Sequence, residues 1–442
     1  MQNLYSKSDT IKYYLDALQQ MQETSEDTSQ MQMIAHQKLG DVYGLDGQFD
    51  EALYHYSRVL EHIQPSQSKA LVFRKMGEIY QKKGDNASAL KQYQVGLAEL
   101  AGKKKSSEAA QILTDIGYIY YLDGKYQEAI KIHTNALETV EGTGDYYVQA
   151  IVYKNLGNVM YEWAKFDQSI EYWEKSREIF ERVNANADLA KLYNNFGELY
   201  MKQGDNDKSL FYFQKSLREK EKLGDVDGLI TSYDNSGKLY RSMGEFDKSL
   251  KSYKKALEIA EQIGSVRKIG IINNNLASMY LSRNEFKKAI EHLEKCLLIF
   301  EKIDLTKGLA YSLANIGYAH CELGNLDEAM DYQNKALETG KELNDPYFVS
   351  GIYHGIGKVY LKKQDYDEAI DCFYKSLKIS EEKRLWETCG ESHRDLGEAY
   401  LGKGNIEEAQ MHLNKAIEIF EKLGNEVELE KIRGISLKIK KP

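Results

Sequence analysis

The chain has 442 residues, of which 42% are hydrophobic and 29% are charged, and it contains three prolines. Its net charge of −9 is spread along the chain, which excludes a general nucleic-acid binder because such proteins carry a basic stripe. No apolar run reaches membrane-spanning length, so we expect no membrane insertion. The four cysteines show no CxxC pairing, and the first ten residues carry no apolar signal core. Both observations predict reduced thiols in a cytoplasmic protein.

Residues 1–30 stand in front of a long internal repeat. Within them, residues 8–22 form a lone amphipathic stretch, which predicts a helix that caps the first repeat. A capping element is expected because the open end of a repeat array would expose an apolar face.

A short signature built around a small residue recurs ten times between residues 31 and 423, nearly always every 40 residues. Twelve residues after it comes a second small residue, and four residues later a position that is mostly bulky, such as Tyr56 or Trp173. Apolar residues recur at helical spacing on both sides of a short polar break, so each unit is predicted to be a helix hairpin. Glycine in the breaks supplies the left-handed residue that ends the first helix. The signature residues are Gly40, Gly77, Gly117, Gly157, Gly197, Gly237, Ala277, Gly317, Gly357 and Gly397.

This arrangement resembles the tetratricopeptide repeat, whose pattern is L-G-x-x-Y, then Ala, then an aromatic residue. The stretches LGDVYGLDGQFDEALYHY and IGYIYYLDGKYQEAIKIH match that pattern. The resemblance covers residues 31–423 and implies an all-α fold, a right-handed α-solenoid (superhelix) of about ten helix hairpins in one domain, with terminal capping helices. Units of this length resemble those of Pins-type adaptors, kinesin light chains and Rap-type peptide receptors. After the last repeat, residues 424–442 are predicted to hold a capping helix over 426–440.

No catalytic or metal-binding constellation is found in the sequence. HRDL at 393–396 copies the start of a kinase catalytic loop, but the downstream asparagine and the glycine-rich loop of kinases are missing. The nine histidines have no HExxH spacing. We therefore predict that the protein is not an enzyme and needs no cofactor and no metal.

One asparagine recurs at the same position of five successive units, two residues before the signature residue. The resemblance places this position on the concave side of the solenoid, where the first helices lie. A carboxamide offers one acceptor and two donors, so it pairs well with the N–H and C=O of an extended peptide. Two alternatives are contacts between neighbouring first helices and a relic of repeat duplication. The ladder consists of Asn155, Asn195, Asn235, Asn275 and Asn315.

Duplication alone should have kept the neighbouring groove position as well, but that position varies among the same five units: Asn158, Glu198, Lys238, Ser278 and Tyr318. The resemblance implies further candidates for peptide contacts in this groove. They are Lys154, Asn158, Lys191, Asn194, Asp234, Lys238, Arg241, Asn274, Tyr311 and Tyr318. A clamp for a C-terminal carboxylate is rejected in the middle repeats, because Thr231 and Asn235 stand where that clamp needs cations.

The groove changes character towards the end of the repeats. Gly351 and Gly355 leave its floor shallow, and charges of both signs follow in the next unit, such as Arg394 and Asp395. Mixed charges favour selectivity for a partner. The first hypothesis is a non-catalytic scaffold that binds an extended peptide segment of a partner protein in the groove. The alternative is a ligand-switched receptor that resembles Rap-type peptide sensors, and self-association through the caps is a further possibility.

Overall fold

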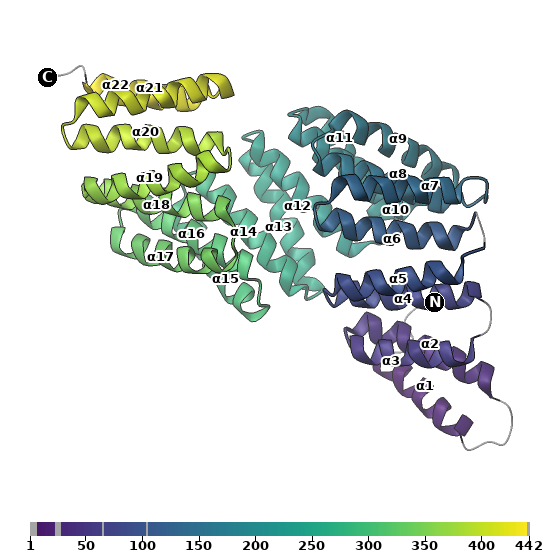
Figure 1. The fold of residues 1–442 in the computed structure, drawn as a ribbon. Helices are drawn as coiled ribbons and strands as arrows, with labels where there is room; N and C mark the ends of the chain where they lie inside the picture. Colours follow the sequence, from purple (N-terminus) through teal and green to yellow (C-terminus); the bar gives the residue numbers. More distant parts are fainter. Residues whose placement is uncertain (1–6, 23–27, 64–65, 103–104, 440–442) are drawn as a thin grey trace. The chain divides into compact units, whose positions relative to one another are not determined.

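The computed structural model describes residues 7–22, 28–63, 66–102 and 105–439. These residues form 22 α-helices and no strand, which confirms the all-α class (Figure 1). The predicted terminal segments also include residues 1–6, 23–27 and 440–442, which lie outside the described part. The chain divides into two compact units, Met1–Glu219 and Lys220–Pro442, and the boundary falls inside one helix. None of the described helices is long and apolar enough to cross a membrane.

The first unit begins with a single helix and continues with helix hairpins. The single helix, α1, packs against the first hairpin, and its Leu18 is buried in a cluster with Leu39 and Tyr56. The helices of this unit are α1 (Lys7–Gln22), α2 (Ser29–Asp46), α3 (Phe49–His62), α4 (Ser66–Lys82), α5 (Asn86–Glu99), α6 (Ser107–Leu122), α7 (Tyr126–Val140), α8 (Tyr146–Glu162), α9 (Phe166–Arg182), α10 (Asn186–Lys202) and α11 (Asn206–Leu223), whose last residues belong to the second unit.

The second unit consists of hairpins followed by a single helix. That helix, α22, covers the apolar face of α21. Its Leu429 and Ile432 are buried in a cluster with Phe420 of α21. The helices are α12 (Val226–Ser242), α13 (Phe246–Gln262), α14 (Val266–Ser282), α15 (Phe286–Lys302), α16 (Thr306–Leu323), α17 (Leu326–Glu342), α18 (Pro346–Lys363), α19 (Tyr366–Glu382), α20 (Trp386–Gly402), α21 (Ile406–Leu423) and α22 (Glu426–Ile439).

A left-handed residue follows the first helix of each hairpin and, from α7 onwards, the second helix as well. Glycine was predicted at the joint after the first helix, and Gly244 has a φ of 74° there. The joint after the second helix uses the same conformation, as at Gly264 with a φ of 69°. From Ala164 onwards these joints are evenly spaced along the chain. They are Ala164, Asn184, Gly204, Gly224, Gly244, Gly264, Asn284, Asp304, Gly324, Asn344, Gln364, Arg384, Gly404 and Gly424.

The signature residue lets the two helices of a hairpin approach closely. A Cβ added to Gly157 would lie 2.2 Å from Cδ1 of Trp173, a fully buried side chain on the second helix of the same hairpin. One repeat carries alanine at the signature position, Ala277. In that repeat the position equivalent to Trp173 is occupied by the smaller Leu293. In the hairpin of Gly157, the small signature residue therefore leaves the room that the indole of Trp173 fills.

A buried or half-buried polar pair recurs in three hairpins and joins the first helix to the second. In each pair, Nδ1 of a histidine on the second helix lies 2.8 Å from a partner atom on the first helix, and the histidine ring stacks on a tyrosine. The pairs are His36 with His55, Asn273 with His292, and His393 with His412. Burial lowers the pKa of His393 and of His412 to about 4.

These lowered pKa values predict a loss of stability in acid. The pKa of histidine in an unfolded chain is about 6.5, so between pH 6.5 and pH 4 the unfolded state binds more protons than the folded state. The stability contributed by the neutral pair is therefore complete above pH 6.5 and is lost as the pH falls towards 4. The loss is at most about 1.4 kcal/mol per pH unit for each proton.

His393→Asn copies the natural pair of Asn273 with His292 and removes one titrating group. We expect this variant to match the wild type near pH 7.5 and to lose less stability between pH 6.5 and pH 4. Urea unfolding followed by circular dichroism at several pH values measures the difference. Equal acid sensitivity of the two proteins would contradict the assignment of this loss to the histidine pair.

Candidate functional site

The asparagine ladder lies on the first helices of five hairpins, α8, α10, α12, α14 and α16. Asn155, Asn195, Asn275 and Asn315 are half-buried, whereas Asn235 is buried. Asn155 and Asn195 belong to the first unit and the other three to the second.

In the first unit the ladder is tied to the packing of a hairpin. Asn195 Nδ2 donates to Oδ1 of Asn158 on the preceding first helix at 3.1 Å. The same oxygen accepts a hydrogen bond from Nε1 of Trp173 at 3.0 Å, so the buried indole orients the Asn158 carboxamide. No hydrogen-bond partner of the Asn155 side chain is found in the described ranges. The structure thus brings together Asn158 and Asn195 of the predicted residues.

The other candidates of the first unit differ in how far they remain available. Lys154 is half-buried, and burial lowers the pKa of its ammonium group, whose nearest carboxylate is Asp188 at 3.9 Å. Asn194 is buried and donates to Glu198 at 2.8 Å. Lys191 is exposed. All three were predicted from the sequence to be groove residues. Of the three, only Lys191 has an exposed side chain.

In the second unit a chain of polar contacts joins α12 to α14. Asn275 Nδ2 donates to Asp234 Oδ1 at 2.6 Å, and the other oxygen of Asp234 lies 2.7 Å from Lys238 Nζ. Lys238 in turn donates to Asn235 at 3.3 Å. These contacts are of the kind expected from the alternative in which asparagines join neighbouring first helices. Arg241 lies half-buried in the last turn of α12.

A polar bridge between neighbouring first helices recurs at equivalent positions of several repeats. It joins Arg74 to Asp115 at 2.6 Å, Asp234 to Asn275 at 2.6 Å and His354 to Asp395 at 2.8 Å. Between α14 and α16 the corresponding residues are Asn274 and Asn315. Oδ1 of Asn274 is buried without a partner, and the Asn315 carboxamide has no hydrogen bond within the described part of the chain. Two carboxamides of this junction therefore keep unused hydrogen-bonding capacity.

Asn315 lines a hollow of about 420 Å³ together with Tyr311 and Tyr318. The hollow lies between α16, α17, α18, α20 and α22. Of the predicted candidates, Asn315, Tyr311 and Tyr318 meet here, and Gly351 and Gly355 line the same hollow. A second hollow of about 930 Å³ lies next to it and shares the side chains of Lys358, Arg394 and Lys431.

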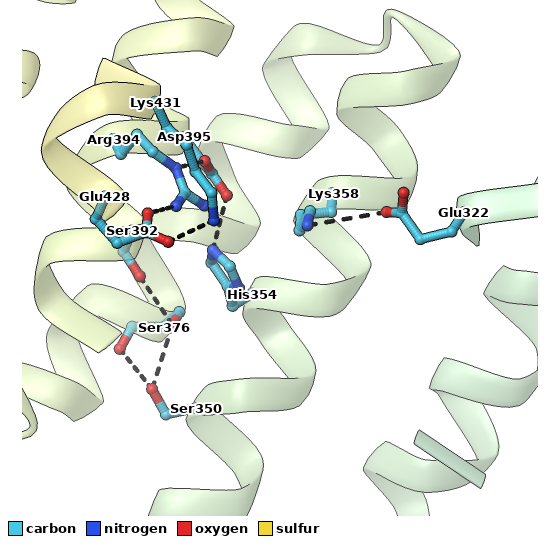
Figure 2. A network of polar contacts seen from close by, with 10 residues as sticks. All are labelled: Glu322, Ser350, His354, Lys358, Ser376, Ser392, Arg394, Asp395, Glu428 and Lys431. Carbon is cyan, nitrogen blue, oxygen red and sulfur yellow. Dashed lines mark hydrogen bonds and ion pairs between the residues drawn. The ribbon is translucent and has the colours of Figure 1, made fainter. Parts of the chain in front are cut away.

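A network of buried charges closes this end of the second unit (Figure 2). Arg394 donates through Nε to Asp395 at 2.6 Å and through Nη1 to Glu428 of α22. His354 Nε2 lies 2.8 Å from the other oxygen of Asp395. Burial opposes the ionisation of Asp395, but the contacts with His354 and Arg394 outweigh it and hold the pKa of Asp395 well below its usual range. The network fixes α22 beside α20.

Three residues of the hollow were missed by the sequence reasoning. Gln333 lies on the second helix α17, at the register that elsewhere carries core residues such as Phe213 and Leu293. A polar residue at that register was the signal that could have revealed it. Lys431 lies on α22, outside the repeat register, so periodicity could not place it. Lys358 occupies, in its repeat, the groove position that varies between repeats. A single cation at a variable position does not by itself indicate a binding site.

Comparison with known proteins identifies the repeat. The tetratricopeptide repeat family matches residues 108–182, 188–262, 268–342 and 348–422, which is more than half of the chain. No curated protein matches the sequence. Repeats of this family generally serve protein–protein interaction without catalysis, and the match supports a protein-interaction scaffold.

Solved structures are similar in fold. A Rap protein complexed with competence and sporulation factor is 16% identical with a TM-score of 0.56, over 81% of this chain and 98% of that chain. Aspartyl phosphate phosphatase F from Bacillus subtilis is 16% identical with a TM-score of 0.54, over 81% and 95%. A signal transduction ATPase with numerous domains and a tetratricopeptide repeat sensor, from Pyrococcus horikoshii, is 14% identical with a TM-score of 0.61, over 98% and 68%. On the family match, the chain belongs to the tetratricopeptide repeat family.

Proposed function

We propose that the chain is a non-catalytic scaffold that binds an extended peptide segment of a partner protein along its first helices. The observation that carries the proposal is the open junction between α14 and α16. There Asn274 and Asn315 lack, among the residues described, the bridge that three other junctions make, and Asn315 lines a hollow together with two tyrosines. A carboxamide in this setting pairs with the N–H and C=O of a peptide backbone.

Two other ladder residues fit the same role, although each also makes a hydrogen bond within the protein. Asn195 and Asn275 each donate one hydrogen bond to a neighbouring first helix. A carboxamide has two donors and one acceptor, so one internal contact orients the group and leaves capacity for a peptide. Preorganised groups lose less side-chain entropy on binding. The receptor hypothesis, which compares the chain with Rap-type sensors, stays a prediction.

Asn315→Ala tests the proposal because this side chain makes no hydrogen bond within the described residues. Decapeptides are first selected from a random phage-displayed library by the wild-type chain. We expect the selected peptides to bind the variant about tenfold more weakly, since two hydrogen bonds of about 0.5–1.5 kcal/mol each are lost. The melting temperature should stay at the wild-type value. Fluorescence polarisation gives the affinity and circular dichroism gives the melting curve.

Asn334→Ala is the matched control, because Asn334 is an exposed asparagine on the second helix α17. It should leave both affinity and melting unchanged. Selection of no peptide at all, or equal affinity of the wild type and Asn315→Ala, would contradict peptide binding at this junction.

A further inference from the structure

The hollow beside Asn315 has a polar floor with an unused acceptor. Gln333 is 3% exposed, and its Nε2 donates to the backbone oxygen of Ala314 at 3.3 Å. Its Oε1 has no hydrogen-bond partner among the residues described. Buried acceptors in folded proteins are nearly always paired, so this oxygen is suited to receive a donor from a bound molecule.

The space above this oxygen exists because a side chain is missing there. A Cβ added to Gly355 would lie 3.0–3.1 Å from the amide atoms of Gln333. The neighbouring Gly351 would meet no atom within 4 Å if it carried a Cβ, as far as the structure describes the chain. Tyr311 and Tyr318 form aromatic walls of the same hollow. A peptide backbone can therefore approach the floor of the hollow.

Three cationic side chains line the hollow. Its lining includes Lys358, Arg394 and Lys431, together with the carboxylate of Glu391. Arg394 is held by Asp395 and Glu428 and stays in place. Lys358 is different, because the carboxylate near it, Glu322, is 4.0 Å away and lies closer, at 3.2 Å, to Lys362. Figure 2 shows Lys358 and Lys431 on opposite sides of His354.

Lys431 extends from α22 towards the same place. Its side chain is 56% exposed and lies 2.5 Å from Glu428, which Arg394 also contacts. Nζ of Lys358 lies 5.6 Å from the ring centroid of Tyr318 on α16. Lys358 and Lys431 therefore line the same hollow as this tyrosine.

We propose that this hollow binds a carboxylate-bearing residue of the peptide. Lys358 and Lys431 bind the carboxylate, Oε1 of Gln333 accepts a backbone N–H, and Asn315 pairs with the adjoining peptide unit. The inference rests on the proposed function and adds the chemistry of the ligand at one end of the groove. The carboxylate belongs either to an aspartate or glutamate side chain or to the C-terminus of the peptide, and the test separates these sources.

The probe is a positional-scanning hexapeptide library, made once with free C-termini and once with C-terminal amides. We expect the wild-type chain to prefer Asp or Glu at one position in both libraries, or to bind the free acids at least about tenfold more tightly than the amides. The first result assigns the carboxylate to a side chain and the second to a C-terminus. Lys358→Gln should remove the preference and reduce the dependence of binding on salt.

Two further variants distinguish ligand contacts from structural effects. Lys378→Gln, at an exposed position on α19, is the matched control and should keep the preference. Gln333→Leu places at this register the residue found at Leu293 and Leu413, so the hairpin should fold. If Gln333 accepts a peptide N–H, this variant binds at least about fivefold more weakly while its melting temperature stays equal or rises.

The outcomes separate this inference from the proposed function. Peptide binding that depends on Asn315 but shows no preference for a carboxylate overturns the inference alone. Unchanged binding by Gln333→Leu overturns the role of the floor. Failure of both libraries to bind overturns the inference and the proposed function together.

Discussion

Arg394→Ala is expected to destabilise the last repeats by about 3–5 kcal/mol, because it breaks a buried ion pair on one side only. Asp395 and Glu428 are 3% and 8% exposed, and both contact the guanidinium group. Without it, two carboxylates remain in the interior with weaker partners. Since each hairpin of a solenoid contacts only its neighbours, the loss should concentrate in α20–α22. Amide hydrogen exchange of these helices measures it.

Arg433→Ala is the matched control for this prediction. Arg433 is an exposed arginine on the same helix α22 as Glu428, and its removal should cost less than about 0.5 kcal/mol. The double variant Arg394→Met with Glu428→Leu replaces both members of one ion pair with apolar residues. It should lose less stability than Arg394→Ala alone, because it leaves one fewer unpaired buried charge. Exchange protection in Arg394→Ala equal to that of the wild type would contradict a stabilising role for the ion pair.

Gly157→Ala is expected to cost about 3 kcal/mol, although alanine forms helices better than glycine by about 1 kcal/mol. The added Cβ would lie 2.2 Å from Trp173 Cδ1. The indole cannot move without losing its hydrogen bonds to Asn158 and to the backbone oxygen of Lys154. The variant should therefore also disturb Asn195, which donates to Asn158. Urea unfolding gives the free energy of unfolding.

A double-mutant cycle tests whether the size of Trp173 causes this cost. In a Trp173→Leu background, which imitates the natural pair of Ala277 and Leu293, the same Gly157→Ala change should be close to neutral. Gly351→Ala is the control, because a Cβ there meets no atom of the described chain within 4 Å and the helix gains propensity. An equal cost of Gly157→Ala in both backgrounds would rule out the steric explanation.

The hairpins could be predicted because several local signals agree at the same register. A small residue, a second small residue and a bulky one recur in phase, and glycine marks most joints after the first helix. The joints after the second helix were harder to recognise. There Asn184, Asp304 and Arg384 adopt the left-handed conformation, and residues of these types occur in many other settings. Tertiary packing of the flanking helices holds them in place.

The candidate site could be predicted only in part. Periodicity placed Asn155, Asn195, Asn235, Asn275 and Asn315 on the first helices, but it carried no information about their partners. The contact between Asn195 and Asn158 depends on the indole of Trp173, and the isolation of Asn315 depends on which residues face it. Gln333 looked like a core position because its register is a core register. The binding role of the ladder stays a prediction.

The left-handed residue that recurs at every joint from Ala164 onwards has a consequence for how such a chain can be shortened or lengthened. Joints such as Asn284 and Gly324 have the same kind of backbone geometry and stand one whole repeat apart. Excision between them removes one first helix and one second helix and leaves a joint of the same geometry. Excision of a single helix would place two helices of the same kind side by side, without the matched small and bulky faces. Length can therefore change by whole hairpins without a new linker.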